Sequence, residues 1–379
     1  MKENESDLIT QKIINAKHPE DVFGGLGEAA DPLKTVLSTY RQLSKLTHPD
    51  LNGGVEAQDA FINLTRLWER AQEKIKLGTY GQIPPDVLLT IRTRVREYEI
   101  FDSFSQTDFC NVHGATYKEG GTNIPAIFKV AKSPLDNEFV ENEAKMLRKL
   151  AEVDNFDNFR PYFPGLIDSF IFEDSNHIRK NINAFSKRPD ELFSFVDVKN
   201  AYPKGIDQKD MAWIFRRVLV GLGFAHQNNL IHGAALPQNL FVQPEKHGLV
   251  INEWSYSVIE KDPTGGRLQA LSGDWESWYP PEVFKKEPVS PGLDIYLGAK
   301  NMIYLLGGNP QLGELPSDIH PKIKAFFRGC LLPAKQRPKD AWGLLEEFDS
   351  MIVDLWGPKK FHVFSMPKNA KGGDKNGRW

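Results

Sequence analysis

The chain has 379 residues, of which 40% are hydrophobic and 26% are charged, and its formal net charge is −3. These values are typical of a folded globular protein with two or three folding units, and they exclude a whole-molecule attraction to nucleic acid or acidic membranes. Two cysteines, Cys110 and Cys330, are too few for a disulfide framework or a metal cluster. The polar start and the lack of a long apolar run in the sequence predict a cytoplasmic protein with no membrane partner.

Three helices are predicted near the start of the chain, over residues 8–17, 31–47 and 56–77. In the second, apolar side chains recur at three- and four-residue steps and define one buried face: Leu33, Val36, Leu37, Tyr40, Leu43 and Leu46. Asp31 before Pro32 is typical of a helix start. Because Pro49 disfavours helical geometry at the residue before it, the helix is expected to end near Thr47.

The predicted helices flank a His-Pro-Asp loop. The segments YRQLSKLTHPD and AFINLTRLWERA resemble helix II with its loop and helix III of a J domain, and HPEDVFGGLG stands at the family's short first helix. The resemblance covers roughly residues 15–80 and implies a J-domain-like helical module over residues 1–80. Its partner would be a DnaK-class 70-kDa heat-shock chaperone, contacted by six residues: Tyr40, Arg41, Lys45, His48, Pro49 and Asp50.

The J-domain resemblance has one departure and one alternative. Leu46 and Thr47 stand where family members usually carry a basic residue and an aromatic, so the basic surface is thinner. A basic helix face beside a fixed Asp would complement an acidic partner surface. Alternatively, Asp50 merely caps a turn and His48 is an ordinary loop histidine.

A domain boundary is predicted at residues 78–86, where GTYGQIPPD is dense in turn-forming residues. Residues 81–94 are assigned to a linker and leading strand. Residues 87–101 alternate between apolar and polar side chains, which predicts one half-buried strand with Arg92, Arg94 and Arg96 on the same face. These arginines either bind phosphate or form a solvated face.

The rest of the chain resembles a protein kinase from about residue 95 to 355. AIFKVAK resembles the strand motif V-A-I-K, FVENEAKMLRKL the helix with the pairing Glu, LIHGAALPQNLFV the catalytic loop, and GLVINEWSYSV the strand leading to D-F-G. WYPPE further matches A-P-E, and DIYLG matches the start of the central helix. Arg337-Pro338 matches the arginine that pairs with the glutamate of A-P-E. The resemblance implies an α+β, two-lobed fold with a β-rich N-lobe over 95–195 and an α-rich C-lobe over 196–357.

The resemblance also implies roles for individual residues. Four would be residual contacts to nucleotide or its metal: Lys129, Glu143, Asn239 and Glu253. The Lys129–Glu143 pair is alternatively a structural ion pair, and spacing alone leaves Asn252 as an alternative to Glu253. Four more would hold the fold together: His232, Glu282, Asp294 and Arg337.

Residues that a kinase uses for chemistry are replaced. Ala234 stands at the catalytic Asp and Glu253 at the metal-binding Asp, while Gly233 replaces an Arg. The glycine-rich loop reads Ser105-Gln106-Thr107-Asp108-Phe109-Cys110, without glycine at any of its three positions. Losing a positioned base costs about 10²–10⁴ in rate. The pattern predicts a pseudokinase with no catalytic residue, no metal site and no required cofactor; weak ATP and magnesium binding is the alternative.

Residues 358–379 form a basic, aromatic tail with six Lys or Arg against one Asp, a net charge of +5. One interpretation is binding to RNA or an acidic partner. The other is that FHVFSMP packs on the C-lobe and the last ten residues are solvated.

Three functions compete at this point. The first is a co-chaperone adaptor, with the pseudokinase as a protein-binding scaffold for an unknown client or assembly protein. The second is a divergent ATP-dependent kinase or nucleotide-binding regulator using Lys129, Asn239 and Glu253. The third is a structural subunit of a larger assembly.

Overall fold

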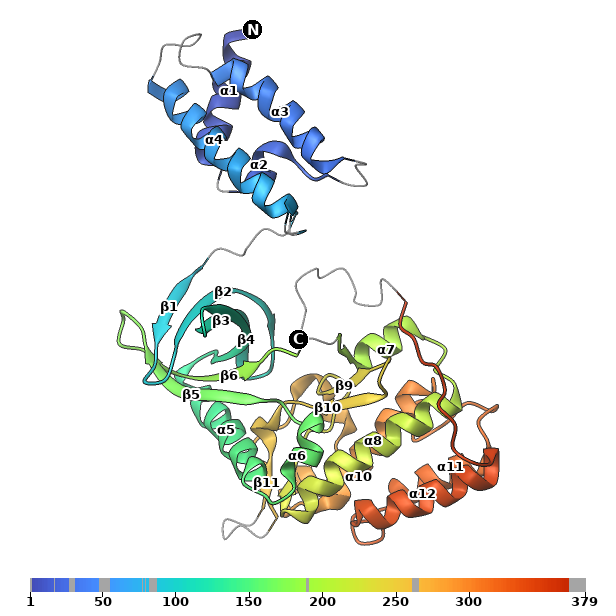
Figure 1. Ribbon diagram of the computed structural model, residues 1–379. Coiled ribbons are helices and arrows are strands. Elements are labelled where there is room, and N and C mark those ends of the chain that lie inside the picture. The colour runs from blue at the N-terminus through green and yellow to red at the C-terminus, as the bar shows by residue number, and fades with distance from the viewer. Residues whose placement is uncertain are drawn as a thin grey trace. The chain divides into compact units, whose positions relative to one another are not determined.

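The computed structural model describes residues 2–16, 18–26, 31–47, 55–76, 78, 80–81, 87–188, 191–260 and 266–367. The chain divides into two compact units, residues 1–86 and 87–379 (Figure 1). The division falls at the end of the predicted turn-rich boundary.

The described part of the first unit is helical, with α1 (Lys2–Asn15), α2 (Pro19–Phe23), α3 (Pro32–Thr47) and α4 (Val55–Lys76). The helices predicted over 31–47 and 56–77 are therefore present, and α1 begins six residues earlier than expected. The core comprises Ile13, Ala16, Phe23, Val36, Ala60, Leu64, Leu67 and Ala71. Asn63 of α4 donates hydrogen bonds to the carbonyls of Ile13 and Ala16, at 2.6 and 3.0 Å, and so fixes the end of α1.

The predicted buried face of α3 is wider than the one observed. Val36 is fully buried, whereas Leu33 and Leu46 are 43% and 40% exposed. These two residues lie in the first and last turns of α3. Periodicity alone does not show which of the apolar side chains on a helix stay exposed.

The second unit begins with a six-stranded antiparallel sheet in the order β1-β2-β3-β4-β6-β5. The sheet curls on itself, and helix α5 (Asn137–Ala151) lies against it (Figure 1). Its strands are β1 (Leu89–Arg92), β2 (Glu97–Gln106), β3 (Cys110–Glu119), β4 (Thr122–Ala131), β5 (Leu166–Glu173) and β6 (Arg179–Ser186).

The single strand predicted over residues 87–101 is wrong, because the chain turns back within it. Thr93 closes a tight turn: its backbone N–H donates to the Arg96 carbonyl at 2.8 Å, and its hydroxyl accepts from the N–H of Val95 and Arg96. The same hydroxyl donates to Asp168 of β5 at 3.0 Å. The arginines therefore share no strand face, and Arg96 lies over the Tyr117 ring.

The remainder of the second unit is mainly helical (Figure 1). Its longer helices are α7 (Phe195–Ala201), α8 (Gln208–Gln227), α10 (Pro291–Leu305), α11 (Pro321–Cys330) and α12 (Ala341–Trp356), and short helical turns are α6 (Phe156–Phe159), α9 (Pro281–Phe284), η1 (Pro134–Asp136), η2 (Arg160–Tyr162), η3 (Trp254–Tyr256) and η4 (Gly273–Trp278). Phe215 of α8 makes edge-to-face contacts with Phe327 of α11 and Phe348 of α12. None of the helices described has both the length and the apolar character to cross a bilayer.

Short strands in the segments between these helices form two small sheets. One has the order β10-β9-β7 and joins β7 (Phe193–Ser194), β9 (Leu240–Gln243) and β10 (Gly248–Ile251). The other pairs β8 (Leu230–Ile231) with β11 (Val258–Ile259). They fix both ends of the loop that resembles a catalytic loop.

The segment FHVFSMP packs on the helical lobe as predicted. Phe364 is 5% exposed and lies against Tyr202 and Trp213. His362 is 2.7 Å from the Asp210 carboxylate at the start of α8. Residues 368–379, which carry the rest of the predicted tail, lie outside the described residues.

Candidate functional site

A buried ion cluster joins the sheet to the segment after β10. The Lys129 ammonium on β4 donates to Glu143 Oε1 of α5 at 2.6 Å and to Glu253 Oε2 at 3.1 Å. Lys129 and Glu143 are fully buried, and the Glu253 side chain is 3% exposed. Asn183, opposite Lys129 on β6, donates to Glu143 Oε2 at 3.3 Å. Three of the four residues predicted as residual nucleotide contacts therefore bind one another.

Burial and the neighbouring charges in this cluster set the direction in which each pKa shifts. Burial alone would lower the pKa of Lys129, but the Glu143 and Glu253 carboxylates outweigh burial and raise it. Burial also raises the pKa of Glu143, and Glu253 adds to that effect while Lys129 opposes it. Lys129 is thus held as a cation by two protein carboxylates, and its charge is satisfied without any phosphate.

The backbone at Glu253 settles which residue faces the lysine. Glu253 has φ 65° and ψ 62°, in the left-handed region that non-glycine residues seldom adopt. Ser255 Oγ donates to Glu253 Oε1 at 2.8 Å, which holds the carboxylate in place. Asn252 instead uses its backbone, donating to the Asn239 carbonyl and accepting from His232 Nε2, both at 2.8 Å. Glu253, and not Asn252, occupies the position opposite Lys129.

The loop at residues 230–242 is held by the buried Asp294 at the start of α10. Its carboxylate accepts from the backbone N–H of His232 and Gly233 and from His226 Nε2, each at 2.8 Å. Although burial opposes ionisation, the hydrogen bond from His226 and the other donors hold the pKa of Asp294 below its ordinary value. Gly233 has φ 78°, and a Cβ there would lie 2.6 Å from Leu268 Cδ2, so the position requires glycine.

Ala234 stands at the centre of this loop and is fully buried. Asn239 is 5% exposed, and its Nδ2 donates to the Ala234 carbonyl at 2.9 Å. Asn301 of α10 donates to the Ala235 carbonyl at 2.7 Å. Both amides therefore fix the backbone of the loop, and the only side-chain group that position 234 offers is a methyl.

The β2–β3 hairpin tip is anchored by the side chains of Phe109 and Asp108. Phe109 stacks on Phe139 of α5, with ring centroids 4.0 Å apart and an interplanar angle of 4°. Tyr256 Oη donates to Asp108 Oδ2, and burial together with this carboxylate raises the pKa of Tyr256. The tip is thereby tied both to α5 and to the segment after Glu253.

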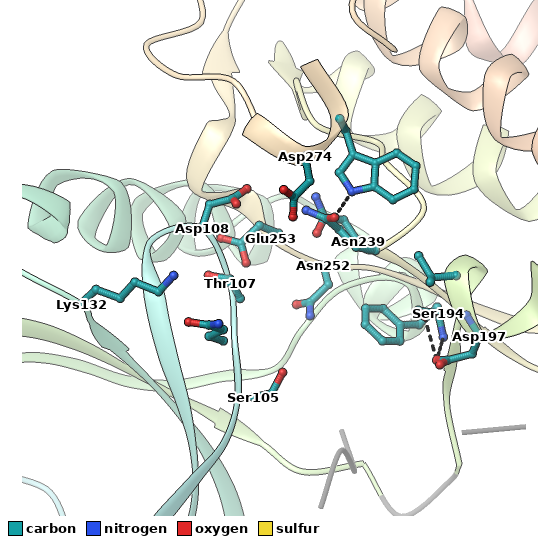
Figure 2. Close-up of a pocket in the computed structure, with 15 residues that line it drawn as sticks. Ser105, Thr107, Asp108, Lys132, Ser194, Asp197, Asn239, Asn252, Glu253 and Asp274 are labelled. Carbon is teal, nitrogen blue, oxygen red and sulfur yellow. Dashed lines mark hydrogen bonds between the residues drawn. The ribbon is translucent and has the colours of Figure 1, made fainter. Parts of the chain in front are cut away.

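A polar cavity of about 580 Å³ opens between the hairpin, β9, α7 and η4 (Figure 2). Its ionisable lining residues are Asp108, Lys132, Asp197, Glu253 and Asp274. A neighbouring apolar space of about 40 Å³ is lined by Ile127, Phe185, Leu192, Phe241 and Val250, among others. Small-molecule sites usually enclose about 300–1,000 Å³, so the apolar space is too small for a purine base.

These residues do not fit a magnesium–nucleotide. The large cavity carries four carboxylates against one lysine, which repels a polyphosphate. Lys129 is already paired twice, and the hairpin tip has side chains where close backbone approach to phosphate requires glycine. Among the residues described, no three His, Cys, Asp or Glu side chains gather closely enough to hold a metal ion.

The residues predicted to stabilise the C-lobe are placed together. Arg337 donates to Glu282 at 2.8 Å, and its guanidinium lies 4.5 Å from the centre of the Tyr296 ring. His232 and Asp294 are joined through the loop backbone as described above. These contacts fasten α9, α10 and the segment before α12 to one another.

The predicted chaperone-binding residues are described only in part. Arg41 and Lys45 are exposed, and they lie one turn apart on α3. Tyr40 is half-buried, because its ring stacks on Trp68 of α4 with centroids 5.1 Å apart. His48, Pro49 and Asp50 lie outside the described residues.

Several site residues carried no clear signal in the sequence. Asp197 was recognisable only as part of the helix-capping pattern Ser194-x-x-Asp197, which the structure shows with the Ser194 N–H donating to Asp197 at 2.8 Å. Asp274 lies in a stretch without periodicity, and Asn183 needed the strand register to be placed opposite Lys129. These residues reach the site only through the fold.

The curled sheet, the helical lobe and the Lys129–Glu143 pair define the second unit as an α+β protein-kinase-like domain. No protein-family model matches the chain. Curated relatives are protein kinases. The calcium/calmodulin-dependent protein kinase type 1 of Caenorhabditis elegans is 26% identical over 243 residues, which are 62% of this chain and 62% of the relative. The type II enzyme of the same organism is 23% identical over 269 residues, 69% of this chain and 34% of the relative.

A third relative is the serine/threonine-protein kinase pakH of Dictyostelium discoideum, which is 20% identical over 283 residues, 72% of this chain and 50% of the relative. Matches of this length exceed the first unit, so they must lie mainly in the second. The chain spans less than two thirds of each of these relatives.

Proposed function

We propose that this protein is a co-chaperone adaptor whose kinase-like domain transfers no phosphate and acts as a protein-binding scaffold. In this proposal the helical first unit is a J domain that recruits a DnaK-class 70-kDa heat-shock chaperone. The observation that carries the non-catalytic assignment is the fully buried Ala234 in a loop whose backbone is held by the amides of Asn239 and Asn301. The scaffold would select a client or an assembly protein.

Phosphoryl transfer is mostly positioning and charge stabilisation, with a carboxylate to orient the attacking hydroxyl. Here position 234 has no carboxylate, and the lysine that would approach the phosphates is 0% exposed between Glu143 and Glu253. The hairpin tip contacts protein side chains in place of a ligand. The missing carboxylate, the buried lysine and the occupied hairpin tip each remove a different contribution to phosphoryl transfer. Restoring one of them would therefore leave the other two contributions missing.

The co-chaperone role is supported by the helical unit. Helices α3 and α4 flank the His48-Pro49-Asp50 segment in the sequence, and Arg41 with Lys45 forms an exposed basic strip on α3. Charge complementarity of this kind guides recognition of an acidic partner surface. Tyr40 contributes through its stacking on Trp68, which holds the two helices together.

The first test measures the ATPase rate of a DnaK-class chaperone with the full-length protein added. We expect stimulation that Asp50→Asn abolishes. Asp59→Asn makes the same chemical change at an exposed position of α4 and should leave the stimulation intact. No stimulation, or equal loss in both variants, would refute the co-chaperone role.

A nucleotide-binding regulator is the second candidate, because the Lys129–Glu143 pair and Asn239 are both retained. Thermal unfolding with millimolar ATP and magnesium separates it from the adaptor, since a ligand of the native state must raise the melting temperature. An unchanged melting temperature is expected. A rise that Lys129→Met removes would favour the regulator.

A further inference from the structure

The polar cavity carries an excess of negative charge. Asp108, Asp197 and Asp274 contribute three carboxylates, and Lys132 is the single cation among the described residues of the lining. Glu253 adds a fourth carboxylate, and the ammonium of Lys129 behind it is shared between Glu253 and Glu143. Asp274 is exposed and has no ion pair among the described residues. The lining therefore favours a cationic occupant.

Buried amide groups aimed into the cavity give an independent indication of a ligand. Asn252 is only 8% exposed, and its side-chain amide has no hydrogen-bond partner among the described residues. Figure 2 shows this amide projecting into the space among the labelled lining residues. Asn239 donates through Nδ2 and leaves its Oδ1 unused. The Asn252 amide atoms and Asn239 Oδ1 are open to the cavity, so they are available to hydrogen-bond a ligand there.

Ionised carboxylates only accept hydrogen bonds, and each amide adds a carbonyl oxygen that also accepts them. A matching ligand must therefore donate hydrogen bonds. An ammonium group carries three donors and no acceptor. Phe241 and Trp275 supply apolar wall beside these acceptors, suited to methylene groups and to a cation over an aromatic face. A bare metal ion would need several of these oxygens gathered around one point, which the described side chains do not provide.

We propose that this cavity binds primary ammonium groups carried on a flexible aliphatic chain. This inference does not depend on the co-chaperone role. The same chemistry has two sources: a free polyamine, and the lysine side chains of residues 368–379. The described chain reaches Pro367 beside α7, where Tyr202 Oη donates to the Ser365 carbonyl.

The second source is within reach of the cavity. Asp197 lies on α7 five residues before Tyr202, about 8 Å along a helix. Residues 368–379 contain Lys368, Lys371, Lys375 and Arg378 against Asp374. Twelve residues extend up to about 40 Å, so their basic side chains are long enough in reach to enter the cavity.

The test titrates spermidine, a linear aliphatic amine, into the full-length protein by calorimetry at low and high salt. We expect binding that weakens with salt and that Asp274→Asn reduces about two- to five-fold, the range for an exposed ion pair. Lys132→Gln should tighten binding because it removes the cation that the described lining carries. Asp318→Asn, an exposed aspartate outside the lining, is the matched control and should bind as the wild type does.

A full-length variant with Lys368→Gln, Lys371→Gln, Lys375→Gln and Arg378→Gln separates the two sources. Equal spermidine affinity in this variant and the wild type assigns the site to a free polyamine. Tighter binding in the variant shows that the chain's own basic residues compete for the cavity. Absence of binding in both proteins, or equal weakening by Asp274→Asn and Asp318→Asn, would overturn the proposal.

Discussion

Lys129 Nζ lies 2.6 Å from Glu143 Oε1, and both side chains are fully buried. A buried ion pair is stable only when its charges and hydrogen-bonding groups are satisfied. Here Glu253 accepts a further hydrogen bond from Lys129, and Asn183 donates one to Glu143. The pair therefore fastens β4 to α5 whether or not a ligand is present. Its presence identifies the fold and gives no evidence of catalysis.

Lys129→Met should destabilise the second unit by about 3–5 kcal/mol, because it leaves Glu143 and Glu253 buried without a cation. Glu253→Gln should cost less, since Lys129 and Glu143 still neutralise each other. Chemical denaturation followed by tryptophan fluorescence measures both, as all tryptophans except Trp68 lie in the second unit. A smaller loss for Lys129→Met than for Glu253→Gln would contradict a structural role for the lysine.

Gly233→Ala should destabilise the loop by about 1–3 kcal/mol, the range for a residue forced into a sparsely populated backbone region. The added Cβ would lie 2.6 Å from Leu268 and 3.0 Å from the Tyr256 carbonyl. Gly273→Ala is the control, because a Cβ there meets nothing within 4 Å. Denaturant midpoints of the two variants should differ clearly; equal midpoints would show that the loop adjusts freely.

Stability should fall as the pH drops from about 7.5 to about 5.5, with His232 as one cause. Burial lowers the pKa of His232 in the folded protein, so the unfolded chain, with an ordinary pKa near 6.5, binds a proton that the native state resists. The contribution of neutral His232 to stability is therefore complete above a pH of about 6.5 and declines as the pH falls below that value. His232→Asn should flatten the stability curve over this range, and an unchanged slope would show that the residue titrates normally.

Asp294 acts at lower pH. Its pKa is depressed in the folded protein, so its contribution is present above the unfolded pKa near 4 and is lost as the pH falls through the folded value. The two groups should therefore be separable on one stability curve measured from neutral to acidic pH.

Phe364→Ala should destabilise the helical lobe by up to about 3 kcal/mol, the lower end for a buried phenylalanine, because the segment is able to detach from α8. Val363→Ala, at a neighbouring side chain that is 78% exposed, should change stability by less than about 0.5 kcal/mol. Thermal unfolding of the two variants provides the measurement. Equal melting temperatures would show that the FHVFSMP segment contributes no packing energy.

Structure was predicted best from the sequence where a capping pattern, an apolar period or a recognised motif fixes the local geometry. Helix α3 follows from Asp31-Pro32 and its apolar period, and the Lys129–Glu143 and Glu282–Arg337 pairs follow from recognised motif positions. The strand over 87–101 was predicted wrongly because alternation cannot reveal a turn. Thr93 makes that turn with hydrogen bonds to its neighbours and to Asp168, which lies 75 residues away in the chain.

The cavity was beyond sequence analysis for a similar reason. Asp108, Asp197 and Asp274 come from a hairpin, a helix and a 3₁₀ turn, and only the packing of these elements brings their charges together. Spacing in the sequence offers Asn252 as an alternative to Glu253, yet the position of its amide on the cavity wall is evident only from the fold. Long-range juxtaposition of this kind leaves no pattern in a single sequence.

The central claim, that the kinase-like domain transfers no phosphate, is tested most directly by a radiolabel transfer assay. Full-length protein would be incubated with labelled ATP and Mg²⁺ or Mn²⁺, using generic protein substrates and the protein itself as acceptors. We expect no label above the level of the Lys129→Ala variant. Transfer by the wild type that Lys129→Ala abolishes would contradict the claim and establish a divergent kinase.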